Sequence, residues 1–447
     1  MDSNVKVSII MPVYNVEEYL HDSLNSLINQ TLTEIEIICV DDCSTDSSGE
    51  ILEFFKWKDN RLRILQNTKN VGAGFSRNKA LSIAKGEYVL FLDSDDWLDE
   101  NAIEELYDKA TKNNLDVLMF KLINYNQDSG IFFKTDYYSM VIVNSYIDKV
   151  FDYRSFDKYK LFKIPNSPCN KLIKTSVLKD NDITFPEGLI HEDNLFFFKL
   201  MFNSKRMMIT DDYYYNRRIR DNSVMTTQDK KLMDIISITD LVMSYFRQEG
   251  YYDEYKRQLL NYLLRALKSR FYDIPIEYKE EYYHKMKENI DKYVNSYSIK
   301  EDFEKELYRP NKTFFNLLVN SKDLNEFNGI VIQDKTVKDS YDVSIVFKID
   351  TYDKKSINAF MANLKNQEID FEDMEIIMLL DGCLFEENTI INQYNDLNHN
   401  VKLINRDRLK ADYKEEIIRK TNGRKTVFLD DNFSDYDGKK LNVVING

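Results

Sequence analysis

Two aspartates, Asp93 and Asp95, are the residues whose type and spacing point most directly to chemistry, because they follow an apolar, strand-like run at residues 88–92. Two carboxylates spaced i, i+2 beyond a strand can face one pocket when the chain bends. Their hard oxygen atoms suit Mg²⁺ or Mn²⁺, ions that also bind substrate phosphates. Such an ion would neutralise the charge that develops on a diphosphate leaving group. A solvated, Asp-rich turn is the competing interpretation.

A second acidic pair, Asp41 and Asp42, directly follows the apolar run at residues 35–40. We interpret Asp41 as a carboxylate that accepts hydrogen bonds from the base or ribose of a nucleotide. The alternative is structural, because Asp42 or Ser44 can cap the helix that follows. Tyr14, just beyond the first apolar run, offers a ring that can stack on the base or simply pack.

A turn with two glycines, at residues 70–74, leads into a helix that carries Arg77. Glycine, here Gly72, lets the backbone approach a ligand closely. The planar guanidinium of Arg77 can hold a phosphate or a carboxylate. The alternative for Arg77 is an ion pair inside the domain, with an aspartate of residues 93–96.

A repeated strand–helix pattern must position these residues. We expect strands at residues 7–11, 35–40, 62–66 and 88–92, alternating with helices at residues 16–29, 47–56 and 75–84. Repeated βα units form a parallel sheet with helices on both faces, and such sheets bind ligands at the carboxyl ends of their strands. The candidates that fall just past strand ends are Tyr14, Asp41, Asn67 and Asp93. We therefore expect their side chains to converge on one pocket.

The composition limits the classes of function. The formal net charge is -14, so the chain is repelled by phosphate backbones, and we expect no nucleic-acid partner. A nucleotide is still allowed, because one metal ion can invert the charge of a small pocket. Four cysteines without a C-x-x-C pair favour a reducing compartment. No signal peptide or apolar run of about 18 residues is visible, so we expect a cytoplasmic protein that can work at the inner face of the membrane.

The length of 447 residues suggests about three domains, which we place at residues 1–228, 229–330 and 331–447. The middle segment is expected to be helical, because its leucines form an apolar stripe at helical spacing: Leu259, Leu260, Leu263, Leu264 and Leu267. We interpret the stripe as packing against the first domain. A surface that faces lipid or acceptor is the alternative.

The third segment repeats the pattern of the first. Residues 343–346 (VSIV) match residues 7–10 (VSII), and residues 427–430 (VFLD) match residues 90–93 (LFLD), at a nearly constant offset. The chemistry is missing from this copy, which reads Asp-Asp-Asn at residues 430–432. We predict a second, partial and degenerate α/β module that serves as a scaffold or interaction module.

Four motifs, taken in order, resemble glycosyltransferase family 2: VSIIMPVYN at residues 7–15, VDDCSTD at 40–46, NVGAGFSRN at 70–78 and FLDSDD at 91–96. The resemblance covers roughly residues 5–225 and departs at Cys43, where glycine is usual. It implies a Rossmann-like GT-A fold and an inverting transfer from a nucleotide diphosphate-sugar, with UDP as the expected nucleotide. The implied acceptor is a hydroxyl of a glycan, a polyol-phosphate or a lipid-linked polymer of the cell envelope.

The resemblance also implies roles for single residues. Asp93 and Asp95 would ligate the metal, with Asp93 also touching the ribose. The other donor-binding positions that it implies are Pro12, Val13, Tyr14, Asp41, Asn67, Gly72, Arg77, Ser94, Arg218, Arg220 and Ser223. The last three lie in a segment that resembles a loop closing on the diphosphate.

The segment His191-Glu192-Asp193 resembles the family segment that carries the catalytic base, at the position of Asp193. Inversion requires a carboxylate that takes the proton of the acceptor hydroxyl during in-line attack. The structural alternative for Glu192 and Asp193 is compensation of a helix dipole.

Two other functions compete with catalysis of sugar transfer. The first is a non-catalytic module that binds nucleotide-sugar or glycan; the intact Asp93, Asp95 and Asp193 argue against it. The second is a nucleotidyltransferase. It should carry a Gly-rich, basic N-terminal loop around a triphosphate, where this chain has Pro-Val-Tyr-Asn at residues 12–15.

Overall fold

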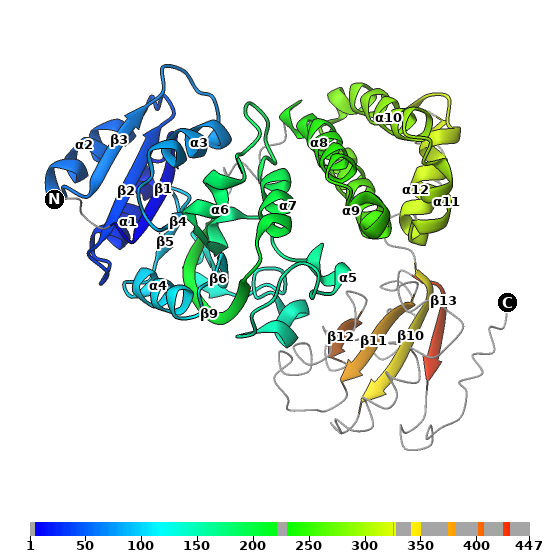
Figure 1. Ribbon diagram of the computed structural model, residues 1–447. Coiled ribbons are helices and arrows are strands. Elements are labelled where there is room, and N and C mark those ends of the chain that lie inside the picture. Colours follow the sequence, from blue (N-terminus) through cyan, green and yellow to red (C-terminus); the bar gives the residue numbers. More distant parts are fainter. Residues whose placement is uncertain are drawn as a thin grey trace. The chain divides into compact units, whose positions relative to one another are not determined.

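The computed structural model describes residues 5–220, 230–324, 326–327 and four strands between residues 341 and 429 (Figure 1). The chain divides into two compact units, Met1–Met286 and Lys287–Gly447, and each is described by itself. The division into three domains at residues 228 and 330 stays a prediction.

The first half of the large sheet is parallel. Its strands are β1 (Val7–Val13), β2 (Ile35–Asp41), β3 (Leu62–Gln66) and β4 (Tyr88–Phe91), in the spatial order β3-β2-β1-β4. The helices between them are α1 (Glu17–Ile28), α2 (Ser48–Lys58) and α3 (Ala73–Ile83). Nearly every side chain of β1 and β2 is buried, as expected of parallel strands covered on both faces. The strands and helices predicted here are confirmed.

The second half of the same sheet is mixed. It continues as β4-β8-β6-β9-β5. In addition, β7 pairs with β6 in antiparallel orientation. These strands are β5 (Trp97–Leu98), β6 (Val117–Asn126), β7 (Ile131–Phe133), β8 (Lys171–Lys174) and β9 (Met207–Ile219), and the helices are α4 (Ala102–Lys112), α5 (Lys158–Leu161), α6 (Thr175–Asp180) and α7 (Asp193–Asn203). β8 runs antiparallel to β4 and β6, whereas β9 is parallel to β6. The pairing Trp97↔Asn216 between β5 and β9 brings the end of β9 beside the loop that follows β4.

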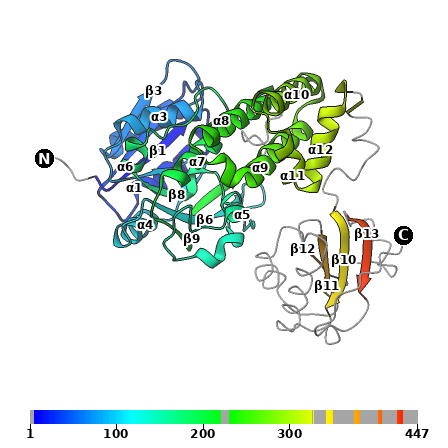
Figure 2. The ribbon, with the colours of Figure 1, turned by 45° about the vertical axis from the view of Figure 1, so that its right-hand side comes forward.

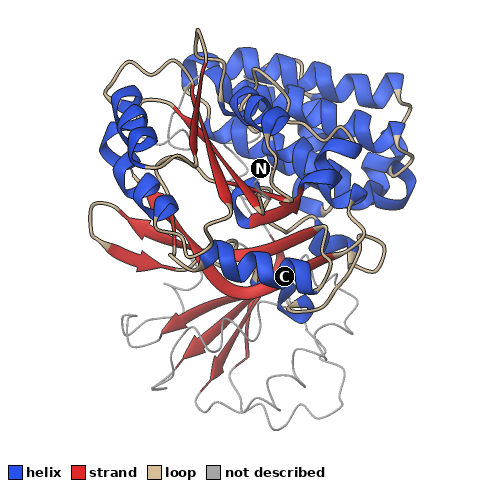
Figure 3. Ribbon diagram, turned by 60° about the vertical axis from the view of Figure 1, so that its left-hand side comes forward, coloured by secondary structure: helices blue, strands red, loops and turns tan. Residues whose placement is uncertain are grey.

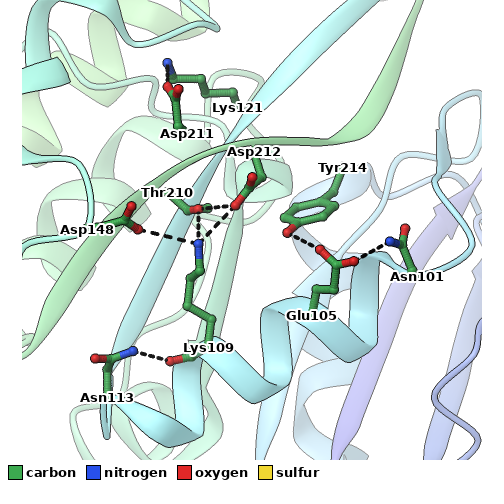
Figure 4. Close-up of polar contacts among 10 residues, drawn as sticks. All are labelled: Asn101, Glu105, Lys109, Asn113, Lys121, Asp148, Thr210, Asp211, Asp212 and Tyr214. Atoms are coloured by element: carbon green, nitrogen blue, oxygen red, sulfur yellow. Dashed lines mark hydrogen bonds and ion pairs between the residues drawn. The ribbon is translucent and has the colours of Figure 1, made fainter.

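Polar contacts fix α4 against β9 (Figure 4). The Nζ of Lys109 donates to Oγ1 of Thr210 at 2.5 Å and to Oδ2 of Asp212 at 3.0 Å. About one turn earlier on the same helix face, Glu105 accepts a hydrogen bond of 2.6 Å from the hydroxyl of Tyr214. These contacts hold β9 at the point where it begins to carry side chains toward the site.

Helices α8 (Asp234–Gln248) and α9 (Tyr252–Asp273) pack beside α7 (Figure 2). The rings of Phe198 and Phe246 are 5.2 Å apart, and those of Phe202 and Tyr255 are 5.1 Å apart. All five leucines of the predicted stripe on α9 are buried. The packing interpretation of the stripe is therefore confirmed, and the alternative of a lipid- or acceptor-facing surface is wrong.

The second unit contains α11 (Lys300–Glu306), α12 (Arg309–Asn320) and a separate four-stranded sheet (Figure 3), and α10 (Lys279–Ser296) crosses the boundary between the units. Its strands are β10 (Tyr341–Ile349), β11 (Met374–Leu380), β12 (Val401–Asn405) and β13 (Gly423–Leu429), all parallel, in the order β12-β11-β10-β13. Counted along the chain, this order is third, second, first and fourth strand, the same as in β3-β2-β1-β4 of the large sheet. Residues 430–432 lie outside the described residues, so the loss of chemistry in a degenerate copy stays a prediction.

Within the described part of the chain, none of the helices combines the length and the apolar character needed to cross a membrane.

Candidate active site

The loop after β4 holds the two predicted metal ligands. The side chain of Asp93 is 43% exposed and that of Asp95 is 19% exposed, so both can reach a ligand. Tyr215 on β9 fixes the loop, because its hydroxyl accepts from the backbone N–H of Asp93 at 3.3 Å and donates to Oδ2 of Asp96 at 2.6 Å. Ser94, between the two aspartates, is buried. The bend that the sequence analysis required is thus held by a residue of a distant strand.

Arg77 connects this loop to the start of α7. Its Nη2 lies 2.8 Å from Oδ1 of Asp93, and its Nη1 lies 2.6 Å from Oε1 of Glu192. The side chain is only 7% exposed, and its guanidinium lies 5.3 Å from the ring centre of Phe185. The ion pair that we gave as the alternative for Arg77 is therefore present, and its contact with the donor stays a prediction.

Asp193 is the first residue of α7 and follows Glu192 directly. The side chain is partly buried. Burial raises the pKa of Asp193 to about 6, and the carboxylate of Glu192 adds to the increase. The Oδ1 of Asp193 accepts a hydrogen bond of 2.9 Å from Nδ2 of Asn194. A carboxylate with a pKa near the working pH is suited to accept a proton.

Arg218 and Arg220, at the end of β9, both reach the aspartate loop. Arg220 contacts Oδ2 of Asp95 through Nε at 3.0 Å and Nη2 at 2.9 Å. The backbone N–H of Arg218 donates to Oδ1 of Asp96 at 2.7 Å, and its Nε donates to the carbonyl of Asp95 at 2.8 Å. The third predicted residue of this segment, Ser223, lies outside the described residues.

The two predicted positions at the end of β1 lie beside the Asp41 strand. Pro12 pairs with Val40 and Val13 with Asp41 in the parallel ladder. Val13 is buried, whereas Tyr14 is 46% exposed at the strand end. An exposed ring in this place is available for stacking on a planar ligand.

Asp41 and Asp42 have different surroundings, although both are buried. Oδ1 of Asp41 accepts from the backbone N–H of Ser44 at 3.0 Å. The carboxylate of Asp42 instead accepts from the backbone N–H groups of Val71 at 3.0 Å and Gly72 at 2.8 Å. The capping alternative for Asp42 and Ser44 is wrong, since Asp42 accepts from the glycine turn and the Oγ of Ser44 accepts from the backbone N–H of Asn15 at 3.2 Å. Asp42 orders the glycine turn.

The glycine turn also depends on the conformation of Gly72 and on the hydrogen bonds of Asn67. Gly72 has φ of 89°, a left-handed conformation that glycine adopts without strain. Asn67 is buried and donates from Nδ2 to Asp42 at 2.8 Å and to Ser76 at 3.0 Å, while its Oδ1 accepts from Lys79 at 2.9 Å. The side chain of Asn67 therefore serves the framework of the turn. Its contact with a donor stays a prediction.

The chemistry of the aspartate loop fits a divalent ion. Burial raises the pKa of Asp95, and the neighbouring carboxylate of Asp93 adds to this, so a cation placed between them is favoured. In the described residues, the aspartate loop included, no cluster of three or more His, Cys, Asp or Glu side chains is arranged for a metal. Mg²⁺ is usually held by one or two carboxylates together with substrate phosphates and water. Asp93 and Asp95 would hold such an ion.

Sequence reasoning missed three residues that organise the site: Asp96, Tyr215 and Asn194. Asp96 was visible as part of the acidic cluster. Tyr215 and Asn194 had no signal of their own, because their roles follow from strand pairing and from the first turn of α7.

Comparison with known proteins gives the family. The model of the family "Glycosyl transferase family 2" matches residues 8–181. Glycosyltransferase GlyG of Streptococcus pneumoniae is 32% identical over 227 residues, which are 50% of this chain and 73% of GlyG. The poly(ribitol-phosphate) beta-N-acetylglucosaminyltransferase TarP of Staphylococcus aureus is 30% identical over 348 residues, 74% of this chain and 99% of TarP.

Among solved structures, the S. aureus TarS fragment 1–349 in complex with UDP-GlcNAc is 26% identical and superposes with a TM-score of 0.45, over 68% of this chain and 93% of that one. Other curated relatives are longer proteins, and the chain spans about a third of their length. The family match, the extent of GlyG and TarP that the chain covers, and the mixed α/β sheet of a GT-A fold lead to one conclusion: the chain belongs to glycosyltransferase family 2.

Proposed function

We propose that the chain is an inverting, metal-dependent transferase that moves a sugar from a UDP-sugar to a hydroxyl of a polyol-phosphate polymer, with Asp193 as the general base. The observation that carries this proposal is the bridge from Asp93 through Arg77 to Glu192, with both contacts at 2.8 Å or less. The bridge joins the loop expected to hold the donor diphosphate to the helix turn that carries the base. It supports one site in which donor and acceptor meet.

In the proposed reaction, the acceptor oxygen forms a bond to the anomeric carbon while the bond from that carbon to the diphosphate oxygen breaks. The nucleoside diphosphate leaves with the electron pair, and the proton of the hydroxyl passes to Asp193. A pKa of about 6 makes this group a carboxylate at neutral pH, ready to take that proton. Attack from the face opposite the leaving group inverts the anomeric centre.

The negative charge of the leaving diphosphate is proposed to be neutralised beside the aspartate loop. Arg218 and Arg220 supply guanidinium groups beside Asp95, and Arg groups bind phosphate oxygens in paired hydrogen bonds. A divalent ion held by Asp93 and Asp95 would, when bound, neutralise further negative charge. Tyr14 and Asp41, at the ends of β1 and β2, are proposed to contact the nucleoside.

The proposed acceptor is an anionic polymer of alternating polyol and phosphate. Two observations favour it. TarP, of which the chain covers 99%, is named for transfer to poly(ribitol-phosphate). The guanidinium of Arg217 lies 5.1 Å from the ring centre of Tyr138. The pKa of Tyr138 is raised, chiefly by burial; Arg217 opposes the increase and Asp193 adds to it. An aromatic ring with a cation beside it therefore lies within electrostatic reach of the base.

The experiment is a donor and acceptor screen on the full chain with Mn²⁺. UDP-N-acetylglucosamine and UDP-glucose are incubated with poly(ribitol-phosphate), and release of UDP is measured together with sugar on the polymer. A ligand that binds the native state alone also raises the melting temperature. Donor-dependent stabilisation with sugar transfer is the expected result.

Two outcomes would overturn the proposal. Stabilisation by donor without transfer to any hydroxyl acceptor would favour a binding module derived from a transferase. Absence of stabilisation by every nucleotide diphosphate-sugar in a broad panel would remove the donor site. Transfer in the presence of excess chelator would contradict metal dependence alone.

A further inference from the structure

The amide of Asn194 lies between the proposed base, Asp193, and helix α9. The predicted domain boundary at residue 228 leaves α9 outside the catalytic domain. The Nδ2 of Asn194 donates to Oδ1 of Asp193 at 2.9 Å and to the carbonyl of His191 at 2.8 Å. Its Oδ1 accepts from Nδ2 of Asn166 at 2.8 Å and from the hydroxyl of Tyr262 on α9. Every polar atom of this amide therefore has a partner.

The partners decide which way the amide points. The two ends of a primary amide have nearly the same shape, but one accepts and the other donates. If the amide of Asn194 rotated by half a turn, its oxygen would face two acceptors, the carboxylate of Asp193 and the carbonyl of His191, and its NH₂ would face the NH₂ of Asn166. These contacts disfavour the rotated amide and keep an N–H directed at Asp193. The hydroxyl of Tyr262 adds a second hydrogen bond to the oxygen of the amide.

Tyr262 suits this task because its hydroxyl acts in both directions. It donates to Asn194 and accepts from Nδ2 of Asn166 at 2.8 Å. Burial raises its pKa, so the hydroxyl keeps its proton at neutral pH. The ring is held separately, 5.2 Å from the ring centre of Phe198 and 5.9 Å from that of Phe162. Ring packing and the hydroxyl contact can therefore be tested apart.

We propose that Tyr262 is a positioning residue for the base: with Asn166 it fixes the amide of Asn194, whose N–H holds the carboxylate of Asp193 in one orientation. This inference rests on the proposed role of Asp193. It makes α9 part of the catalytic apparatus, although α9 lies within the predicted helical segment 229–330 and carries no family motif.

Loss of the Tyr262 hydroxyl should shift the pKa of Asp193 in one direction, whereas loss of a purely structural contact should not. A hydrogen bond donated to a carboxylate favours its ionised form and lowers its pKa. Without the hydroxyl of Tyr262, the oxygen of the Asn194 amide accepts from Asn166 alone, and the N–H that donates to Asp193 is held less firmly. The pKa of the base should then rise, and the acid limb of the pH–rate profile should move to higher pH.

The test compares Tyr262→Phe with Tyr255→Phe in the full chain. Tyr255 is buried on the same helix, and its hydroxyl meets the carbonyl of Tyr153 at 3.4 Å. The profile of kcat/KM against pH is measured for each, together with the KM for donor and the melting temperature. For Tyr262→Phe we expect a several-fold loss at pH 6 that shrinks at pH 8, with an unchanged donor KM. Tyr255→Phe should follow the wild-type profile.

Failure of this inference can be told apart from failure of the proposed function. If Asp193→Asn retains full transfer, Asp193 is not the base and the proposed function is wrong. If Asp193→Asn abolishes transfer but Tyr262→Phe has the wild-type profile, the positioning role alone is overturned. It is also overturned if Tyr262→Phe loses the same factor of activity at every pH.

Discussion

The guanidinium of Arg220 lies on the carboxylate of Asp95, with Nε 3.0 Å and Nη2 2.9 Å from the same oxygen. The side chain is also 4.8 Å from the ring centre of Tyr19. Asp95 is a proposed metal ligand, so an internal cation already neutralises the carboxylate on which a divalent ion depends. Binding of such an ion would then be linked to release of Arg220, whose guanidinium would be available to the donor diphosphate.

Replacing Arg220 by glutamine should therefore strengthen Mn²⁺ binding in the absence of donor. Loss of one cation beside Asp95 removes a competitor, and we expect a several-fold lower Kd for Mn²⁺, measured by electron paramagnetic resonance of the free ion. The same variant should have a higher KM for the donor. Arg217→Gln removes an equal charge from β9, where Arg217 bonds to Asn124 at 3.2 Å, and serves as the control. Weaker Mn²⁺ binding by Arg220→Gln would contradict the competition.

Asp193→Asn should abolish most transfer and leave donor binding intact. The substitution keeps the shape of the side chain but removes the basic oxygen, and loss of a general base typically costs ~10²–10⁴-fold in rate. Transfer rate and donor-dependent melting temperature are measured on the same preparation. A variant that loses both would show that Asp193 supports the fold of the site instead.

The pH–rate profile of the wild-type chain should report the pKa of Asp193. Burial raises that pKa to about 6, and only the ionised form can accept a proton. kcat/KM should therefore fall below about pH 6 and level off above it. An acid limb near the ordinary aspartate value of about 4 would contradict the assignment.

The same shift predicts that Asp193 reduces stability at neutral pH. Its pKa is higher in the folded chain than in the unfolded one, so the folded state binds the proton more tightly and this destabilisation grows as pH rises through the window from about 4 to 6. Asp193→Asn should raise the melting temperature by about 2 °C or more at pH 7.5. The gain should disappear near pH 4, where the wild-type carboxyl is neutral in both states. Calorimetry at the two pH values checks the sign.

Arg77→Met should be among the most destabilising substitutions in the site. It leaves the carboxylates of Asp93 and Glu192 without their shared cation, and removing one partner of a buried ion pair costs ~3–5 kcal/mol. Arg63 provides the comparison, because it is 43% exposed and lies 3.3 Å from Glu36. Arg63→Met should change the free energy of unfolding by ~1 kcal/mol or less. Similar losses for the two variants in urea unfolding would argue against the bridge.

The first half of the sheet could be predicted because its signals are local. Short β-branched runs set β1 to β4, and the aspartates after β4 follow from the strand end alone. Local signals could not show that Asp42, and not Asp41, binds the glycine turn. Adjacent residues at a strand end point to opposite sides, and only the folded chain shows that Asp42 meets the turn at Gly72.

The second half of the site depends on pairings between distant segments. Tyr215 reaches Asp96 because β9 runs beside β5, and Tyr262 reaches Asn194 because α9 packs near α7. Both tyrosines are ordinary members of apolar patterns in the sequence. Nothing in their spacing separates a ring that only packs from one whose hydroxyl serves the site.

The packing of α8 and α9 on α7 also sets the smallest piece of the chain that can work. A fragment cut near residue 228 would uncover the rings of Phe198 and Phe202 and would lack the hydroxyl that steadies Asn194. The family motifs end well before that hydroxyl. If Tyr262 has the proposed role, the catalytic module extends beyond the family motifs, at least to the end of α9 at Asp273.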